Sequence, residues 1–400
     1  MKFSAVSPYN AASAPKLPDK ITIYDSTLRD GEQMPGVHFT PEQKVSIATK
    51  LDEVGVHQIE AGFPAVSDEE KRTVRQVAKL GLDADVICLA RTLPADIEAA
   101  AACDVDMVLL FIATSEIHLN YKLKMTREEV VGRVTSSLDY AHALGLKASL
   151  STEDSTRSDM GFLLDVYRVS EKSHAARLGI TDTLGCAGPP AISYIVRRVR
   201  EATKAPISAH LHNDFGFAMA NSIAALSNGA EAITTTVGGI GERAGNVPLE
   251  QFVMALKHLY KRDLGIKTEE MSELSKMVFS YAKLPVPSNQ PWVGANAFSH
   301  EAGIHVAAVL NCPMTYECVD PEEVGNKRRL VFGKHSGTAL VKTRLDEWKL
   351  SATQDQICEI VRGIKHAGED HGRVSDYEFW KIVRDVLDLK TEKPQNVEEE

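Results

Sequence analysis

A charged segment that runs from Asp25 to Gln33 follows directly on a short apolar stretch, residues 21–24, whose composition is typical of a β-strand. Within this segment Arg29 and Asp30 are adjacent. Charged side chains at the end of a strand are suited to chemistry, because packing alone does not require them there. The sequence therefore predicts a functional site at this strand end.

A pair of histidines, His210 and His212, follows a second strand-like stretch, residues 206–208. Residues two apart in a strand lie on the same face, so both imidazoles can point at one spot. With the carboxylate of Asp30 they would form a site for a divalent metal ion, Zn, Mn or Mg, with open positions for substrate oxygens. Either histidine alone would be an ordinary polar residue of a loop. The pair on one face, with Asn and Asp directly after it, favours the metal.

Apolar runs of β type recur along the chain, and their starts are about 30 residues apart. Segments with a helical pattern, such as 41–54 and 127–144, lie between these runs. This alternation predicts an α/β fold of the (β/α)8 type, a TIM barrel. The expected strands are 21–24, 57–62, 85–90, 107–112, 147–151, 177–181, 206–210 and 232–236.

The first helix of this pattern has sequence signals at both of its ends. Thr40 can cap the helix, Pro41 suits its first position, and Gln43 completes a capping box. Gly55 follows the last helical residue and is suited to ending the helix. The first strand and helix are therefore well specified.

In a barrel of this kind the active site lies at the C-terminal ends of the strands. Each polar residue there also has a structural explanation: Glu60 as a buried ion-pair partner, Arg157 as a solvated residue at a helix start, Ser115 as a cap. Their convergence from eight loops predicts one pocket. The polar residues at the expected strand ends are Arg29, Asp30, Glu60, Arg91, Ser115, His118, Glu153, Arg157, Asp182, Thr183, His210, His212, Glu242, Arg243 and Asn246.

Composition and charge restrict the class of protein. The chain has 400 residues, 44% hydrophobic and 25% charged, which suits one large globular domain with an appendage. A net charge of −10 without a long basic run argues against an extended nucleic-acid surface. No apolar stretch reaches the roughly 20 residues that span a bilayer, and the N-terminus lacks a signal-peptide pattern, so we expect no membrane contact and a cytoplasmic location. The six cysteines lack metal-binding or disulfide spacing, and we expect reduced residues that mostly pack in the interior.

Four separated motifs resemble, in the same order, those of the isopropylmalate synthase and homocitrate synthase family. They are Asp-Ser-Thr-Leu-Arg-Asp-Gly-Glu-Gln at 25–33, His-Leu-His-Asn-Asp at 210–214, Gly-Ile-Gly-Glu-Arg-Ala-Gly-Asn at 239–246 and Ser-His-Glu-Ala-Gly-Ile-His at 299–305. The resemblance covers the chain approximately from residue 20 to residue 385. It implies a metal-dependent Claisen condensation of acetyl-CoA with a 2-oxo acid, followed by hydrolysis of the thioester.

The resemblance also implies roles for the residues that match the motifs. Arg29 would stabilise negative charge that develops on the reacting oxygens, and its alternative role is a structural ion pair with a barrel carboxylate such as Glu60. The metal would be held by Asp30, His210 and His212, with Asn246 in or beside the coordination shell. The 2-oxo acid would be contacted by Gln33, Arg91, His118, Ser151 and Thr183, and the acetyl-CoA region would include Gly241, Arg243 and Asn246.

A base outside the barrel is implied as well, because a methyl proton of acetyl-CoA must be removed. His305 is the expected base, with Tyr316 beside it, and Glu153 would raise its basicity. The alternatives are a purely structural histidine at 305 and His300 as the base. In the family this segment reaches over the pocket of a partner subunit, so we expect a homodimer with lid residues shared between subunits.

The chain is expected to divide into four parts. They are a flexible N-terminal arm (1–19), the catalytic TIM barrel (20–284), a linker and lid subdomain (285–340), and a helical C-terminal subdomain with an acidic tail (341–400). The long regulatory domain that follows in most isopropylmalate synthases is missing, so leucine or isoleucine feedback through it is not expected.

The identity of the 2-oxo acid depends on finer features. Ser149 occupies the position of an Arg that, in the lysine-pathway homocitrate synthases of fungi and some bacteria, pairs with the distal carboxylate of 2-oxoglutarate. The Ile117-His118 pair resembles the isopropylmalate-like branch and the methanogen and nitrogen-fixation homocitrate synthases. The Tyr-Glu and Asp-Pro-Glu-Glu-Val-Gly linker resembles archaeal homocitrate-forming enzymes, which favours homocitrate synthase. The alternatives are 2-isopropylmalate, citramalate or phosphonomethylmalate synthase, a metal-dependent aldolase or lyase on the same barrel, and a noncatalytic binding protein.

Overall fold

The computed structural model describes residues 4–390 and 393–394. The chain divides into two compact units, one formed by Pro8–Val286 and the other by Pro287–Glu400 with Met1–Ser7. The acidic tail expected at the end of the chain lies outside the described residues. The boundary between the units falls close to residue 284, where the sequence predicts the end of the barrel.

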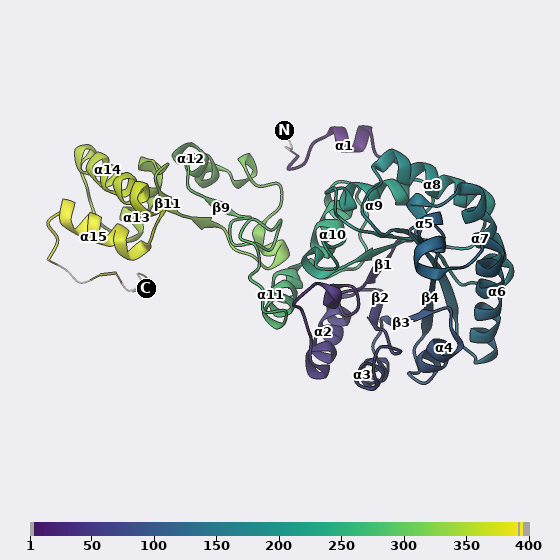
Figure 1. The fold of residues 1–400 in the computed structure, drawn as a ribbon. Helices are drawn as coiled ribbons and strands as arrows, with labels where there is room; N and C mark the ends of the chain where they lie inside the picture. Colours follow the sequence, from purple (N-terminus) through teal and green to yellow (C-terminus); the bar gives the residue numbers. More distant parts are fainter. Residues whose placement is uncertain (1–3, 391–392, 395–400) are drawn as a thin grey trace. The chain divides into compact units, whose positions relative to one another are not determined.

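Eight parallel strands form a closed barrel in the first unit, in the order of the sequence (Figure 1). The first strand, β1 (Thr22–Asp25), pairs with β2 (Gln58–Gly62) on one side and with β8 (Ala232–Thr235) on the other, which closes the sheet. The predicted TIM barrel is thereby confirmed. The remaining strands are β3 (Asp85–Arg91), β4 (Met107–Ala113), β5 (Ala148–Glu153), β6 (Leu178–Asp182) and β7 (Ile207–Leu211).

Helices surround the ring of strands (Figure 1), and the first of the repeating units shows why they begin and end where they do. The helix α2 (Pro41–Val54) starts at a capping box in which Thr40 and Gln43 satisfy each other's backbone N–H groups, and it ends at Gly55, whose φ is 96°. These signals were all expected from the sequence. The other helices of this unit are α1 (Tyr9–Ala12), α3 (Asp68–Ala78), α4 (Pro94–Ala101), α5 (Glu116–His118), α6 (Arg127–Ala143), α7 (Met160–Lys172), α8 (Pro189–Ala202), α9 (Ala218–Ser227), α10 (Leu249–His258) and α11 (Met271–Tyr281).

Short helical turns connect several strands to the helices that follow them, and the loops that contain them carry part of the site. They are η1 (Gly31–Gln33), η2 (Leu119–Leu123), η3 (Ser155–Arg157) and η4 (Val237–Gly239), while η5 (Thr268–Glu270) lies between α10 and α11. In β2 the register shifts between Glu60 and Gly62, which redirects the end of that strand. The segment expected to be a flexible arm contains α1 and the buried Leu17, whose carbonyl accepts a hydrogen bond from Arg262.

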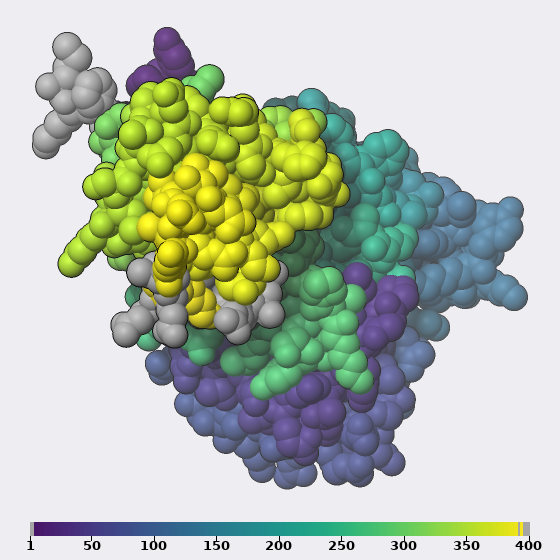
Figure 2. All heavy atoms as spheres, turned by 90° about the vertical axis from the view of Figure 1, so that its left-hand side faces the viewer, coloured from purple at the N-terminus to yellow at the C-terminus, as the bar shows by residue number. Residues whose placement is uncertain are grey.

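The second unit is mostly helical and has its own core. Phe379 has no exposed surface and stacks on Phe332, with ring centroids 4.0 Å apart. Val306 and Phe332 precede the predicted boundary at residue 340, yet they share one core with Ile360 and Phe379, which follow it. In Figure 2 the atoms of the C-terminal part of this unit, yellow-green to yellow, lie together in one continuous mass. The elements are β9 (Ser299–His300), α12 (Gly303–Asn311), η6 (Pro313–Thr315), η7 (Pro321–Val324), β10 (Arg329–Leu330), β11 (Phe332–Gly333), α13 (Thr338–Glu347), α14 (Gln354–His371), β12 (Arg373–Val374) and α15 (Asp376–Val386).

Two further expectations concern cysteines and membranes. All six cysteines lie in the described part of the chain and none of them forms a disulfide. Only Cys88 and Cys103 are buried, so the expectation that most cysteines pack in the interior is wrong, because the other four lie on connecting segments or, for Cys358, on the exposed side of α14. Among the described helices, none combines the length and the apolar character needed to cross a membrane.

Candidate active site

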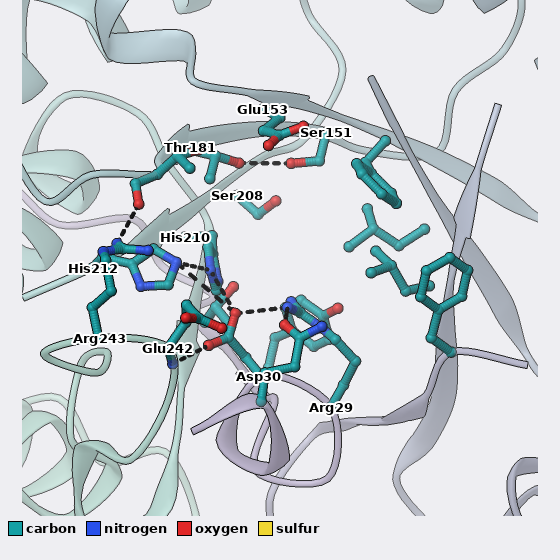
Figure 3. A pocket seen from close by; sticks show the side chains of 18 residues that line it. Arg29, Asp30, Ser151, Glu153, Thr181, Ser208, His210, His212, Glu242 and Arg243 are labelled. Carbon is teal, nitrogen blue, oxygen red and sulfur yellow. Dashed lines mark hydrogen bonds and ion pairs between the residues drawn. The ribbon is translucent and has the colours of Figure 1, made fainter. Parts of the chain in front are cut away.

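Asp30, His210 and His212 each bring one potential ligand atom within 4.8 Å of the other two (Figure 3). His210 Nε2 lies 3.3 Å from Asp30 Oδ2 and 3.1 Å from His212 Nε2. His212 Nε2 lies 3.9 Å from Asp30 Oδ2. Ligand atoms that are about 2.1 Å from one ion lie about 3 to 4 Å from each other, so this spacing fits a divalent cation. The structure thus brings the three predicted metal ligands together.

The positions of these residues follow from strand geometry. His210 lies in β7 and His212 directly after it, and both imidazoles point into the barrel mouth, as the two-residue period requires (Figure 3). Their rings meet edge to face, with centroids 4.9 Å apart. Asp30 lies directly before η1, in the loop that follows β1. Only β8 separates β1 from β7 in the barrel, so Asp30 and the two histidines lie at the same end of neighbouring parts of the sheet.

The pKa values of Asp30 and His212 are both shifted in the direction that favours binding of a cation. Burial would raise the pKa of the Asp30 carboxyl, but the Arg29 guanidinium and His210 hold that pKa well below its usual range. Burial, together with the neighbouring His210, lowers the pKa of His212 to about 4. Asp30 is therefore an anion and His212 a neutral imidazole near pH 7, which are the protonation states that metal ligands need.

Asn246 is hydrogen-bonded to the Asp30 carboxylate. Its Nδ2 group donates to Asp30 Oδ1 over 2.9 Å, and its own Oδ1 is buried without a hydrogen-bond partner among the described residues. An unpartnered buried oxygen beside a carboxylate suits a place in or next to the coordination shell. Gly241 is needed for this arrangement, because a Cβ there would collide with Asn246 Nδ2 and Asp30 Oδ1. The contacts of Gly241 are thus with the metal-site residues.

Arg29 lies between two carboxylates. Its Nη1 is 2.6 Å from Asp30 Oδ2, and its Nη2 is 2.9 Å from Oε2 of the fully buried Glu60. The ion pair with Glu60, expected as the alternative to a catalytic role, is therefore present. The two roles are compatible, since the Arg29 side chain also lines the cavity next to the metal ligands.

A cavity of about 320 Å³ opens at this end of the barrel and includes most of the predicted residues. The predicted residues that line it are Arg29, Asp30, Gln33, Ser151, Glu153, Thr183, His210, His212 and Arg243, together with Glu242. Figure 3 shows Ser151, Glu153 and Ser208 across the cavity from Asp30 and Arg29. The predicted convergence is therefore seen at the ends of β1, β5, β6, β7 and β8, whereas the polar residues predicted at the ends of β2, β3 and β4 do not line the cavity.

Two residues predicted to contact substrate lie outside the cavity wall. Arg91 donates from Nε and Nη2 to both carboxylate oxygens of Asp96, over 2.7 and 2.9 Å, so the first turn of α4 holds its guanidinium. His118 Nδ1 lies 3.7 Å from Asp154 Oδ2 and 4.0 Å from Glu153 Oε1. Their substrate contacts stay predictions.

The sequence interpretation missed a layer of hydroxyl and apolar side chains inside the barrel. Thr181 pairs with Ser151 over 2.8 Å, and Ser208 and Thr234 line the same cavity. The signal was available, because Thr181 and Ser208 stand two residues from other strand-end positions and therefore share their inward face. The apolar part of the wall consists of Tyr24, Phe63, Leu89, Leu109 and Phe111.

Glu153 has a partner that the sequence did not suggest. Lys122, in η2, binds both of its carboxylate oxygens, over 2.6 and 2.7 Å. Arg243 is also engaged, since its Nε donates to Asp214 Oδ1 over 2.9 Å and its Nη2 donates to the Thr183 carbonyl. The carboxylate of Glu153 and the guanidinium of Arg243 are thereby held in place.

The expected base and its neighbour lie in the second unit, where the structure brings them together. The rings of His305 and Tyr316 have centroids 4.0 Å apart, and both residues are exposed. His300, the alternative base, is 11% exposed and its Nε2 lies 3.0 Å from Glu317 Oε1. Glu317 also binds Arg328. His305 is therefore the more accessible of the two histidines, and its catalytic role stays a prediction.

Comparison with known families matches both units. The HMGL-like family model matches residues 20–278, and the model described as homocitrate synthase post-HMGL domain-like matches residues 292–372. Among solved structures, an HMG-CoA lyase of Bacillus subtilis has a TM-score of 0.61 at 21% identity and covers 68% of this chain and 96% of its own. This structural likeness shows the barrel fold alone.

Relatives of similar sequence cover nearly the whole chain. Homocitrate synthase AksA of Methanopyrus kandleri is 51% identical over 386 residues, which are 96% of this chain and 97% of the relative. Homocitrate synthase AksA of Methanothermobacter thermautotrophicus is 48% identical over 95% of this chain and 97% of the relative. A probable 2-isopropylmalate synthase of Methanopyrus kandleri is 48% identical over 93% of this chain and 74% of its own length. The chain is thus an enzyme of the HMGL-like family and belongs to the isopropylmalate synthase and homocitrate synthase group of acyltransferases.

Proposed function

We propose that this chain is a homocitrate synthase, which condenses acetyl-CoA with 2-oxoglutarate and hydrolyses the thioester to release homocitrate and CoA. The observation that carries the proposal is the cluster of Asp30, His210 and His212 beside Arg29 in one cavity. Support for 2-oxoglutarate as the substrate comes from homocitrate synthases that are similar to this chain over 95–96% of its length. The cytoplasmic location expected from the sequence stays a prediction.

A divalent cation held by Asp30, His210 and His212 would polarise the keto group of the 2-oxo acid and orient its carboxylate. We propose Zn, Mn or Mg for this role, since each accepts a carboxylate and imidazoles. The neutral His212 and the ionised Asp30 supply the required lone pairs.

The remaining cavity residues would bind and orient the 2-oxo acid. Thr183 Oγ1 accepts the Asp154 N–H over 2.8 Å, so its own hydroxyl proton is directed to another acceptor, such as the substrate carboxylate. The Arg29 guanidinium would stabilise the negative charge that develops on the keto oxygen. Gln33, next to Arg29 in the cavity wall, is placed to donate an amide N–H to the same substrate.

His305 would act as the base. It would take a proton from the methyl group of acetyl-CoA, and the methyl carbon would then form the new C–C bond to the keto carbon. Water would afterwards break the thioester, with CoA leaving as the thiol. We propose that His305 and Tyr316 act on the barrel of a partner subunit in a homodimer; this rests on the family resemblance and on the exposure of both side chains.

A second candidate, 2-isopropylmalate synthase, is favoured by the apolar part of the cavity wall. Phe63 and Phe111 meet edge to face, with centroids 6.3 Å apart, and Leu89 and Leu109 lie beside them in the wall. Such a wall suits the branched alkyl group of 2-oxoisovalerate. Ser149, at the position that holds an Arg in the lysine-pathway homocitrate synthases of fungi and some bacteria, is fully buried and does not line the cavity.

The test is CoA release from acetyl-CoA with added Mn²⁺ or Zn²⁺, measured with 2-oxoglutarate, 2-oxoisovalerate, pyruvate, phosphonopyruvate and phenylpyruvate. Release with 2-oxoglutarate would support homocitrate synthase, and preference for 2-oxoisovalerate would replace it with the second candidate. Asp30→Ala protein in parallel controls for contaminating activity. No release with any acid from folded, metal-loaded protein would overturn the condensation and favour the lyase alternative.

A further inference from the structure

Lys44 is a buried cation that lies close to the candidate active site but is not part of it. It is in α2, and its side chain is only 2% exposed. Its ammonium group binds Glu32 Oε2 over 2.6 Å and the two carboxylate oxygens of Glu70 over 2.9 and 2.8 Å. All three N–H donors of the ammonium thus have an acceptor.

The two acidic partners follow different strands of the barrel, Glu32 after β1 and Glu70 after β2. Glu32 lies in η1, directly after Asp30 and Gly31, and its Oε1 accepts the Phe39 N–H over 2.9 Å. Glu70 lies at the start of α3, and its Oε1 accepts the Phe63 N–H over 3.1 Å. Lys44 therefore joins the loop after β1 to the loop after β2.

The position of the Glu70 carboxylate requires a glycine at position 62. A Cβ on Gly62, whose φ is 152°, would collide with the Glu70 carboxylate. The absence of a side chain at this position lets Glu70 reach the Phe63 N–H. The junction thus depends on a glycine at the strand end as well as on the three charges.

Both loops joined by Lys44 present side chains to the cavity, namely Arg29, Asp30 and Gln33 from the first and Phe63 from the second. Gln33 follows Glu32 directly and lines the cavity, and the Phe63 ring lines it on the apolar side. A second hollow of about 300 Å³ is lined by Lys44, Glu32 and Glu70, and it shares Arg29, Gln33 and Phe63 with the cavity. Glu32 is therefore the direct chain neighbour of Gln33, and Glu70 is hydrogen-bonded to the backbone of Phe63. Gln33 and Phe63 are the groups that would touch the 2-oxo acid.

We propose that Lys44 is a positioning residue for 2-oxo acid binding, which sets the relative placement of Gln33 and Phe63 by holding both loops on one buried ammonium. The proposal rests on the proposed function, since it assigns the cavity to the 2-oxo acid. It does not require that Lys44 contact the substrate or the metal.

The test compares Lys44→Met with Lys50→Met. Lys50 is the matched control, because it lies on the same helix, is 12% exposed and also binds acidic residues, Glu270 and Glu273, away from the cavity. We expect Lys44→Met to raise the KM for the 2-oxo acid by about tenfold or more. The KM for acetyl-CoA and the affinity for Mn²⁺ should stay at the wild-type values, and Lys50→Met should leave all three unchanged. Lys44→Arg, which keeps the charge, should recover part of the loss.

Removal of one buried charge can also prevent folding, so a second variant is needed. The triple change Glu32→Gln, Lys44→Met, Glu70→Gln leaves no uncompensated charge, and its amide oxygens can still accept the Phe39 and Phe63 N–H groups. We expect it to fold and to keep the raised KM. A wild-type KM in folded Lys44→Met or in the folded triple variant would overturn the proposal. Wild-type protein that is inactive with every 2-oxo acid would instead overturn the proposed function.

Discussion

Arg29 and Glu60 form an ion pair inside the barrel, with Nη2 and Oε2 2.9 Å apart, and the Glu60 side chain has no exposed surface. Glu60 Oε2 also accepts a hydrogen bond from Ser26 Oγ. Burial would lower the pKa of Arg29, but the carboxylates of Glu60 and Asp30 hold it above its ordinary value. Glu60 thus neutralises part of the Arg29 charge, which would otherwise pair with Asp30 alone.

Glu60→Gln should therefore destabilise the barrel, because it leaves a buried guanidinium with one carboxylate where it had two. We expect the free energy of unfolding to fall by about 3 kcal/mol, measured by urea denaturation. Glu116→Gln breaks an ion pair between Glu116 and Arg127, whose side chains are 55% and 41% exposed, and should cost less than about 1 kcal/mol. Equal losses in the two variants would show that burial of the Arg29 pair does not matter.

Asp30→Asn should weaken metal binding, because the amide cannot supply the negative charge that the two histidines lack. We expect the Kd for Mn²⁺ to rise by about a hundredfold or more in calorimetric titrations. Asp214→Asn is the control: Asp214 is a nearby carboxylate that binds Arg243 and lies outside the cluster of three ligands. Full metal content in Asp30→Asn protein would remove Asp30 from the site.

Asp25 should make stability depend on pH. It is completely buried, and burial raises its pKa from 3.8 to about 7. The folded state therefore holds a proton between about pH 4 and pH 7 that the unfolded state releases, so the free energy of unfolding should fall as the pH rises through this window. A shift of this size corresponds to about 4 kcal/mol.

The measurement is urea denaturation of wild-type and Asp25→Asn protein at pH 5 and pH 8. An asparagine can still accept the Thr27 N–H and can donate to the Thr235 hydroxyl, which now donates to Asp25, so the variant should fold. It should lose this component of the pH dependence and be more stable than wild type at pH 8. Asp165→Asn, at an exposed ion pair with Arg168, should keep the wild-type dependence. An unchanged slope in Asp25→Asn would contradict the assignment.

If His305 acts on the partner's barrel, two inactive variants should complement each other. Asp30→Ala and His305→Ala are each expected to lack CoA release, and a mixed dimer restores one site with both residues intact. Activity should therefore reappear after subunit exchange, which mass spectrometry of the dimers can verify. Persistent inactivity in proven mixed dimers would mean that His305 and Asp30 of one chain serve the same site.

Some features of this protein follow from local sequence. The eight strands begin and end within two residues of the predicted limits, because short apolar runs between turn signals have few alternative structures. The helix from Pro41 to Val54 has the predicted bounds, because Thr40, Gln43 and Gly55 satisfy its terminal groups locally. His210 and His212 share a face for the same local reason, namely the two-residue period of a strand.

Other features depend on which residues of distant strands reach the same level of the barrel. The register between β5 and β6 pairs Ser151 with Gly179, which brings the hydroxyl of Thr181, two residues further along β6, within 2.8 Å of the Ser151 hydroxyl; no local pattern contains that register. Lys122 binds Glu153 because this lysine, which follows β4, meets the end of β5 only after the chain has folded. The sequence by itself thus determined the barrel, through the regular alternation of strand and helix patterns, and predicted Asp30, His210 and His212 as metal ligands, through the two-residue period of a strand and a matched motif. Only the tertiary structure decided the wall of the cavity and the partners of its charges, since these are contacts between segments far apart in the chain.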